Sequence, residues 1–133
     1  MAQYGLERVV PLSYEEALRR TKEALQEQGF GVLTEIDVRA TLQKKLGVEH
    51  PPCAILGACN PPLAYQALQV EPDVALLLPC NVVVREEEGG VKVSIMDPDV
   101  MARFTGNPAL EPLAREARAR LEKVLERLTS AEE

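Results

Sequence analysis

Five stretches of the chain carry the apolar patterns expected of β-strands. Phe30–Ile36 and Val91–Met96 alternate between apolar and polar residues, which is the period of a strand with one buried face. The other three are Gln3–Val10, Cys53–Cys59 and the nearly continuous apolar run Val74–Arg85, which Pro79 interrupts. Gly89-Gly90 lies between the stretches Val74–Arg85 and Val91–Met96, so we predict that these two form a hairpin.

Two longer stretches repeat with the period of a helix. The first begins with Ser13 as N-cap and Glu16 three residues later, a capping box, and ends at Gly29. The second follows Asn107-Pro108 and should be the longest helix. Its apolar spacing of four and three would also suit a coiled-coil seam, but the repeat is too short, so we expect it to pack on the sheet. The apolar faces consist of Tyr14, Ala17, Leu18, Thr21, Ala24 and Leu25 in the first helix, and of Leu110, Ala114, Ala117, Leu121, Val124 and Leu128 in the second.

Capping residues indicate shorter helices between the strands. Asp37 can cap a helix that Gly47 closes. Asn60-Pro61 starts another that runs to about Gln69, and Asp97-Pro98 repeats the same signal.

Elements in this order indicate an α+β fold. The predicted order is β-α-β-(α)-β-(α)-β-β-α-α. It gives a mainly antiparallel sheet of about five strands, covered on one side by the two long helices. The 133 residues suffice for one domain with its own core, so we assign residues 1–133 to a single α+β domain.

Composition narrows the range of partners and compartments. The net charge is −6, the basic residues are scattered, and Trp is absent, which argues against a nucleic-acid partner. No apolar run is long enough to cross a bilayer. Because no export signal opens the chain and it has three cysteines, an odd number, we expect a cytoplasmic protein with reduced thiols. Arg outnumbers Lys and Pro is frequent, as in heat-adapted proteins.

A Cys-Asn pair occurs twice, as Cys59-Asn60 and Cys80-Asn81. Each pair lies where an apolar run meets a proline, so each thiol is expected at the end of a strand. If the two strands are antiparallel neighbours joined by the helix that follows Asn60, both thiols lie at one end of the sheet. Cys59 would also directly precede a helix N-terminus, whose dipole and free N–H groups favour a thiolate.

Two thiolates close together can bind a soft ion such as Cu(I), form a reversible disulfide or carry a sulfane sulfur. The opposing interpretation is structural, because cysteine packs as a small apolar residue and Asn60 suffices as a helix N-cap. Asn81 fits that interpretation less well, since strand interiors disfavour asparagine, and we expect its side chain to bond to the backbone or to line a pocket. The candidate ligand-binding residues are therefore Cys59, Asn60, Cys80 and Asn81, with Cys59 and Cys80 as candidate catalytic or metal-binding thiols.

Other chemistry has little support in the chain. His50 is the single histidine, and it completes a metal site with Cys53 only if both converge with the other two thiols. The acidic run Glu86-Glu87-Glu88 is typical of a solvated hairpin tip rather than a calcium loop. Asp97 and Asp99 are typical of a helix start. No Ser-His-Asp arrangement can be assigned.

Four separated motifs also fall in an order that points to a known family. They are Ser13-Tyr14-Glu15-Glu16 through Gly29-Phe30-Gly31-Val32-Leu33, Leu56-Gly57-Ala58-Cys59-Asn60-Pro61, Leu78-Pro79-Cys80-Asn81-Val82-Val83-Val84, and Asp97-Pro98. Together they resemble the bacterial and archaeal domain-of-unknown-function family 302, whose Asn-Pro and Leu-Pro signatures would fall on Asn60-Pro61 and Leu78-Pro79. The resemblance implies a single-domain α+β fold like that of the TATA-box-binding protein, often as a dimer, with no established activity. The fold carries no inference of DNA binding, given the acidic charge balance.

We expect a small cytoplasmic homodimer that binds a small ligand or a soft metal at the Cys59/Cys80 end of the sheet. It should have no nucleic-acid or membrane partner and no cofactor other than a soft ion such as Cu(I). The first alternative is a thiol enzyme for redox chemistry or sulfur transfer, with Cys59 as nucleophile and Cys80 as resolving thiol. The second is an interaction module without a small-molecule site, which would use the final helix or an open sheet edge.

Overall fold

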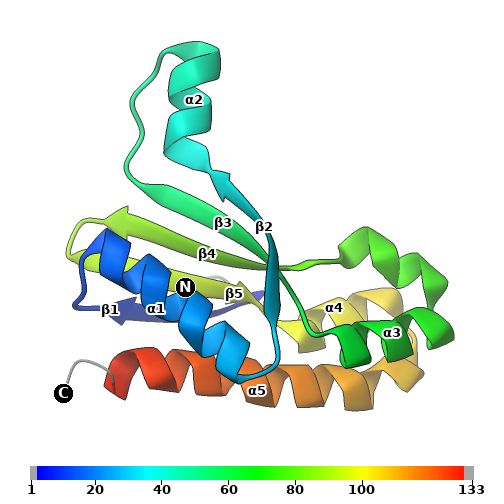
Figure 1. Ribbon diagram of the computed structural model, residues 1–133. Coiled ribbons are helices and arrows are strands. Elements are labelled where there is room, and N and C mark those ends of the chain that lie inside the picture. The colour runs from blue at the N-terminus through cyan, green and yellow to red at the C-terminus, as the bar shows by residue number, and fades with distance from the viewer. Residues whose placement is uncertain (1–2, 131–133) are drawn as a thin grey trace.

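The computed structural model describes residues 3–130 and confirms the predicted α+β class. One five-stranded sheet, antiparallel throughout, has the spatial order β1-β5-β4-β3-β2 (Figure 1). Its strands are Gly5–Val10 (β1), Gly31–Asp37 (β2), Cys53–Cys59 (β3), Cys80–Glu87 (β4) and Gly90–Met96 (β5).

The two long helices pack on one face of this sheet and form the main core with it. α1 spans Tyr14–Glu27 and α5 spans Glu111–Ser130, and they lie against each other as well as against the strands (Figure 1). The largest fully buried side chains of this core are Leu25, Leu56, Ile95, Leu121, Leu125 and Leu128. The final helix therefore packs on the sheet, as its apolar pattern predicted. Among the described residues, no helix is both long and apolar enough to span a membrane.

The predicted start of α1 forms in part. Ser13 Oγ accepts a hydrogen bond from Glu16 N at 3.1 Å, which is one half of the capping box. The Glu16 carboxylate does not return to the Ser13 backbone, because it accepts hydrogen bonds from Arg19 and Arg20 at 2.6 and 2.7 Å. The Glu16 carboxylate, which the sequence assigned to the cap, therefore pairs with Arg19 and Arg20 instead.

The predicted hairpin forms, but its first strand is shorter than expected. β4 begins at Cys80, and Pro72–Leu77 is a 3-10 helix (η1) instead of strand. Pro72 occupies the first turn of η1, and Pro79 has no N–H to give to a sheet ladder. The prediction that one strand continues across Pro79 was wrong. Val74 and Leu78 are apolar because they pack into a second, smaller core, and not because they belong to the sheet.

This second core extends the molecule beyond the end of the sheet. It is built by α3 (Pro61–Val70), η1, α4 (Pro98–Thr105), a 3-10 turn (η2, Pro108–Leu110) and the start of α5. Its buried residues are Val74, Ala102, Leu110 and Ala114. Asn107 links the start of η2 to the C-terminal end of α3, since its Nδ2 donates to Val70 O at 3.1 Å and to Glu71 Oε1 at 2.9 Å.

An arm rises from the sheet on the side away from α5 (Figure 1). We define it as residues 36–53, which comprise α2 (Val38–Leu46) and the strand ends that carry it. Asp37 and Gly47 cap the helix as predicted: Asp37 Oδ1 accepts from Ala40 N at 2.9 Å, and Gly47 has φ 68°. α2 has no buried residue, and Ile36, Leu46 and Val48 are 48%, 69% and 44% exposed. The arm thus has no core of its own.

Candidate functional site

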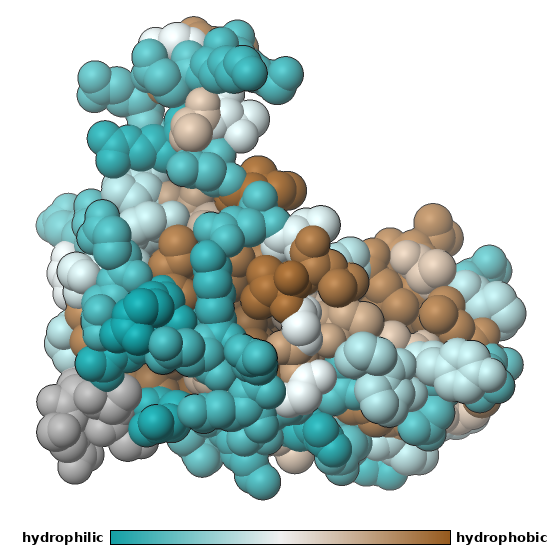
Figure 2. Space-filling model, in the orientation of Figure 1, coloured by the Kyte–Doolittle hydropathy of each residue, from teal (hydrophilic) through white to brown (hydrophobic). Residues whose placement is uncertain are grey.

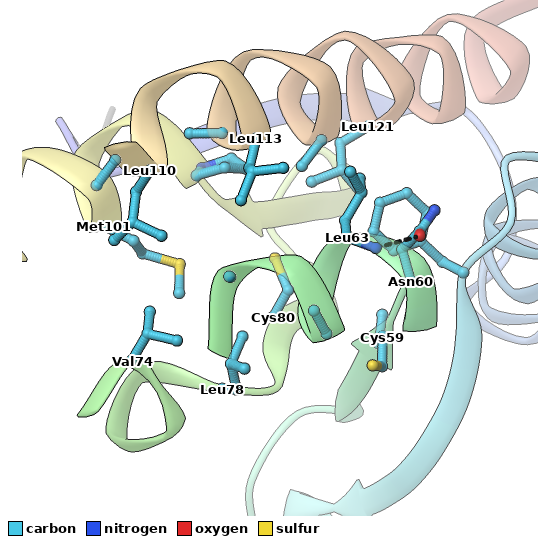
Figure 3. Close-up of a pocket in the computed structure, with 18 residues that line it drawn as sticks. Cys59, Asn60, Leu63, Val74, Leu78, Cys80, Met101, Leu110, Leu113 and Leu121 are labelled. Atoms are coloured by element: carbon cyan, nitrogen blue, oxygen red, sulfur yellow. Dashed lines mark hydrogen bonds between the residues drawn. The ribbon is translucent and has the colours of Figure 1, made fainter. Parts of the chain in front are cut away.

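A pocket lies where the sheet ends and the two cores meet (Figure 3). It measures about 110 Å³ and is bounded by α3, η1, α4, α5 and the adjoining ends of β3 and β4. Its lining side chains are almost all apolar and include Phe30, Leu63, Val74, Leu78, Met101, Leu110, Leu113 and Leu121. Cys59, Asn60 and Cys80 are the lining residues with a heteroatom that can act as a hydrogen-bond donor. We call this space the Cys80 pocket.

The two cysteines of the Cys-Asn pairs meet at one end of the sheet, as predicted, but on opposite faces. β3 pairs antiparallel with β4, and Ala58 lies directly opposite Cys80. Because cross-strand partners share a face and neighbours along a strand alternate, Cys59 points to the face opposite Cys80. Figure 3 shows the same arrangement, with the Cys80 sulfur directed into the pocket and the Cys59 sulfur directed away from it. The two thiols are therefore not placed to share one ion or to form a disulfide in this conformation.

Cys80 is held as a neutral thiol. Its Sγ donates a weak hydrogen bond to Met96 O at 3.5 Å. Burial, and to a lesser degree the negative charge of Asp97, raises the pKa of the Cys80 thiol from 9.0 to about 12. Near neutral pH this side chain is a polarisable wall of the pocket and not a nucleophile.

Asn60 serves both the backbone and the pocket. It is the N-cap of α3, where its Oδ1 accepts from Leu63 N at 3.2 Å, as the sequence predicted. Only 6% of the residue is exposed. Asn81 has a different position: it lies opposite Gly57 in the sheet, is exposed, and does not line the pocket.

Cys53 and His50 lie away from the pocket. Cys53 begins β3 and Cys59 ends it, so the length of the strand, about 20 Å for seven residues, separates them. His50 is in the arm, where its Nδ1 contacts Pro51 O at 2.7 Å. Within residues 3–130, no group of three or more His, Cys, Asp or Glu side chains is placed to hold a metal ion.

Several residues that shape the pocket gave no signal in the sequence. Met101 and Leu113 come from α4 and α5, whose apolar residues are indistinguishable in the sequence from core residues. Arg118 holds these two helices together, since its Nη1 lies 3.2 Å from a carboxylate oxygen of both Asp97 and Asp99. Asp97 also caps α4 by accepting from Asp99 N at 2.9 Å. The two aspartates that the sequence assigned to a helix start thus also fix the pocket wall.

Comparisons with known proteins give a family but no activity. The chain matches the model of the domain of unknown function DUF302 over residues 6–128. A solved structure, the uncharacterized conserved protein DUF302 from Bacillus stearothermophilus, is 33% identical and superposes with a TM-score of 0.89, covering 96% of this chain and 99% of that one. Comparison with curated proteins found no match. The predicted resemblance is confirmed, and the chain belongs to the DUF302 family.

Proposed function

We propose that the protein binds a small, mainly apolar molecule in the Cys80 pocket. The observation that carries this proposal is the pocket itself, an apolar hollow between two cores that are each separately packed. Protein interiors seldom leave voids larger than a water molecule, because each lost contact weakens the core. A space of about 110 Å³ with almost no polar lining would stay poorly hydrated and favour an apolar occupant.

The size of the pocket limits the occupant. Engineered cavities of about 150 Å³ bind benzene, so the Cys80 pocket suits a compact group such as one ring or a short alkyl chain. The neutral state of Cys80 favours a binding function over thiol catalysis, since a reactive cysteine needs its thiolate. The position of Cys59 on the other face of the sheet also favours binding over thiol catalysis, because Cys80 could act as a resolving thiol only if it reached Cys59.

The test is to fill the pocket from one wall. Ala114 on α5 lines the pocket, and Ala119, on the same helix, is exposed. Binding of benzene is followed by shifts of methyl resonances in an NMR titration. We expect shifts near the pocket in the native protein and in Ala119→Leu, and their loss in Ala114→Leu. If benzene shifts no pocket resonance in the native protein, or shifts them equally in Ala114→Leu, the proposal fails.

A second candidate function, self-association through the arm, is favoured by the surface of the molecule. The chain exposes 7832 Å², whereas a compact monomer of 14.6 kDa exposes about 6900 Å². The difference of about 900 Å² is close to the area that each partner buries in a standard interface. Figure 2 shows apolar surface from the base of the arm toward α3 and η1, where a second copy could cover it.

Charge points to the same partner. The arm holds three basic residues, Arg39, Lys44 and Lys45, and two acidic residues, Asp37 and Glu49, so its net charge is +1 in a chain with a net charge of −6. An arm of one copy is therefore attracted to the body of another. Sedimentation equilibrium tests this: Leu46→Lys should give a monomer, and Phe104→Lys, which changes an even more exposed apolar residue on α4, should leave the dimer intact. A native protein that sediments as a monomer contradicts self-association.

A further inference from the structure

Two sulfur atoms face into the Cys80 pocket, whose walls carry no charge. None of the described residues that line the pocket is an aspartate, glutamate, lysine or arginine, so it offers no ion-pair partner to a charged ligand. The sulfurs belong to Cys80 at the start of β4 and to Met101 on α4. Figure 3 shows both of them directed into the same space, whereas the sulfur of Cys59 points away from it. An uncharged occupant would therefore meet sulfur from two different elements of the fold.

The Cys80 sulfur presents its lone pairs to an occupant. Its hydrogen is directed to Met96 O, which lies 3.5 Å from Sγ. Because burial raises the pKa of Cys80 to about 12, that hydrogen stays on the sulfur near neutral pH. The side chain is thus a neutral, polarisable group and a weak acceptor, with its donor already used within the chain.

The Met101 sulfur comes from a helix that is fixed in place. Asp97 caps α4 by accepting from Asp99 N at 2.9 Å, and Arg118 on α5 lies 3.2 Å from a carboxylate oxygen of each aspartate. The thioether itself has no hydrogen to donate, and its unbranched side chain can adapt to the shape of an occupant. Met101 therefore adds a second adaptable sulfur to a wall whose backbone is held by ion pairs.

Sulfur at a pocket wall distinguishes aromatic from saturated groups. The edge of an aromatic ring is positive and its face is negative, so a sulfur lone pair is attracted to the ring edge from about 5 Å away. A saturated ring has no such charge distribution and gains only dispersion contacts. Phe30, which is 3% exposed, lines the same pocket and offers an aromatic neighbour that a second ring can meet edge to face or offset.

We infer that the occupant of the Cys80 pocket is a compact, uncharged aromatic group, such as a single six-membered ring, whose edge contacts the sulfurs of Cys80 and Met101. One sulfur contact of this kind raises affinity by about two- to tenfold. This inference rests on the proposed binding function. It adds the chemical class of the ligand, since the size of the pocket alone admits a short alkyl chain as well as a ring.

Benzene and cyclohexane, two six-carbon rings, are the probes. They differ in hydrophobicity, so the readout is the ratio of their dissociation constants in each variant of the full chain, from NMR titrations of methyl resonances. Met101→Leu removes one sulfur at nearly constant volume. Met96→Leu is its matched control, because Met96 is partly buried like Met101 but does not line the pocket. We expect the preference for benzene to fall about threefold in Met101→Leu and to stay native in Met96→Leu.

Cys80→Ala tests the second sulfur. This change enlarges the pocket for both probes, so the added volume largely cancels in the ratio, and we expect the preference for benzene to fall about threefold here as well. A ratio that neither Met101→Leu nor Cys80→Ala changes, or that Met96→Leu changes equally, would overturn the inference and leave the proposed binding function standing. If neither probe shifts a pocket resonance of the native protein, the inference and the proposed function both fail.

Discussion

Because the folded protein keeps Cys80 neutral, its free energy of unfolding should fall measurably at high pH. The pKa of the folded thiol is raised from 9.0 to about 12, first by burial and then by Asp97. Above pH 9 the unfolded chain loses this proton while the folded chain keeps it. The folded state then binds one proton more than the unfolded state, so the free energy of unfolding falls as the pH rises. The contribution of Cys80 is fully present below pH 9 and is lost as the pH approaches 12.

The size of the effect follows from the two pKa values. Between pH 9 and 12 the slope is about 1.4 kcal/mol per pH unit, so at pH 10 the native protein has lost about 1.4 kcal/mol through Cys80. Cys80→Ala removes the titrating group and leaves a small void, which costs about 1–2 kcal/mol at pH 7. The gap in stability between the native protein and Cys80→Ala should therefore nearly close at pH 10.

Urea unfolding followed by far-ultraviolet circular dichroism, with a reductant present, gives both stabilities by linear extrapolation. Other groups that titrate in this range are common to the two proteins and cancel in the difference. Cys53, whose pKa is also raised by burial, is one of them. A stability gap that is the same at pH 7 and pH 10 would refute the reasoning, because it would mean that the folded thiol ionises as readily as the unfolded one.

Two further substitutions test the frame of the pocket. Gly57→Ala would place a methyl group against Thr34, and we expect this to lower the free energy of unfolding in urea by about 1–3 kcal/mol. Gly31→Ala is the control, because its new Cβ would come no closer than 4.0 Å to a group outside its neighbours in the chain, and it should cost less than about 1 kcal/mol. Equal costs for the two variants would contradict the steric account. Arg118→Gln leaves the largely buried carboxylate of Asp97 without its charged partner, so we expect a loss of about 1–3 kcal/mol in urea unfolding at pH 7. An unchanged stability would count against the ion pair.

Local rules predicted most of the fold. Ser13, Asp37 and Asn60 each cap the helix that follows them, because a short polar side chain after an extended residue can reach a free backbone N–H. The strand ending at Cys59 and the strand beginning at Cys80 pair antiparallel, since a short helix between them returns the chain along the sheet. The caps depend on residues within one turn, and the strand pairing depends on a connection of about twenty residues between neighbouring strands, which is why the sequence alone suffices for them.

The candidate site could be predicted only in part, because it depends on distances across the chain. The repeated Cys-Asn pair led to the end of the sheet at which the pocket lies. Two residues that end neighbouring strands can face either side of the sheet, however, and a shift of one residue in register reverses the face. Ala58, and not Cys59, lies opposite Cys80. Arg118 gave no signal, because it is one of several arginines on α5 and its partner Asp97 lies at another helix start, about twenty residues earlier in the chain.

The largest departure from the predicted secondary structure is also the origin of the pocket. If Val74–Arg85 had formed one strand, Val74 and Leu78 would extend the sheet, and nothing would cover the ends of β3 and β4. Pro79 cannot donate to a ladder and Pro72 starts a helical turn, so the chain folds η1 over α4 and α5 instead. Apolar residues that a longer sheet would have buried then line a hollow that the two cores leave between them. The pocket follows from two prolines that end a strand early, and we expect substitutions that restore strand pairing there to close the pocket before they unfold the protein.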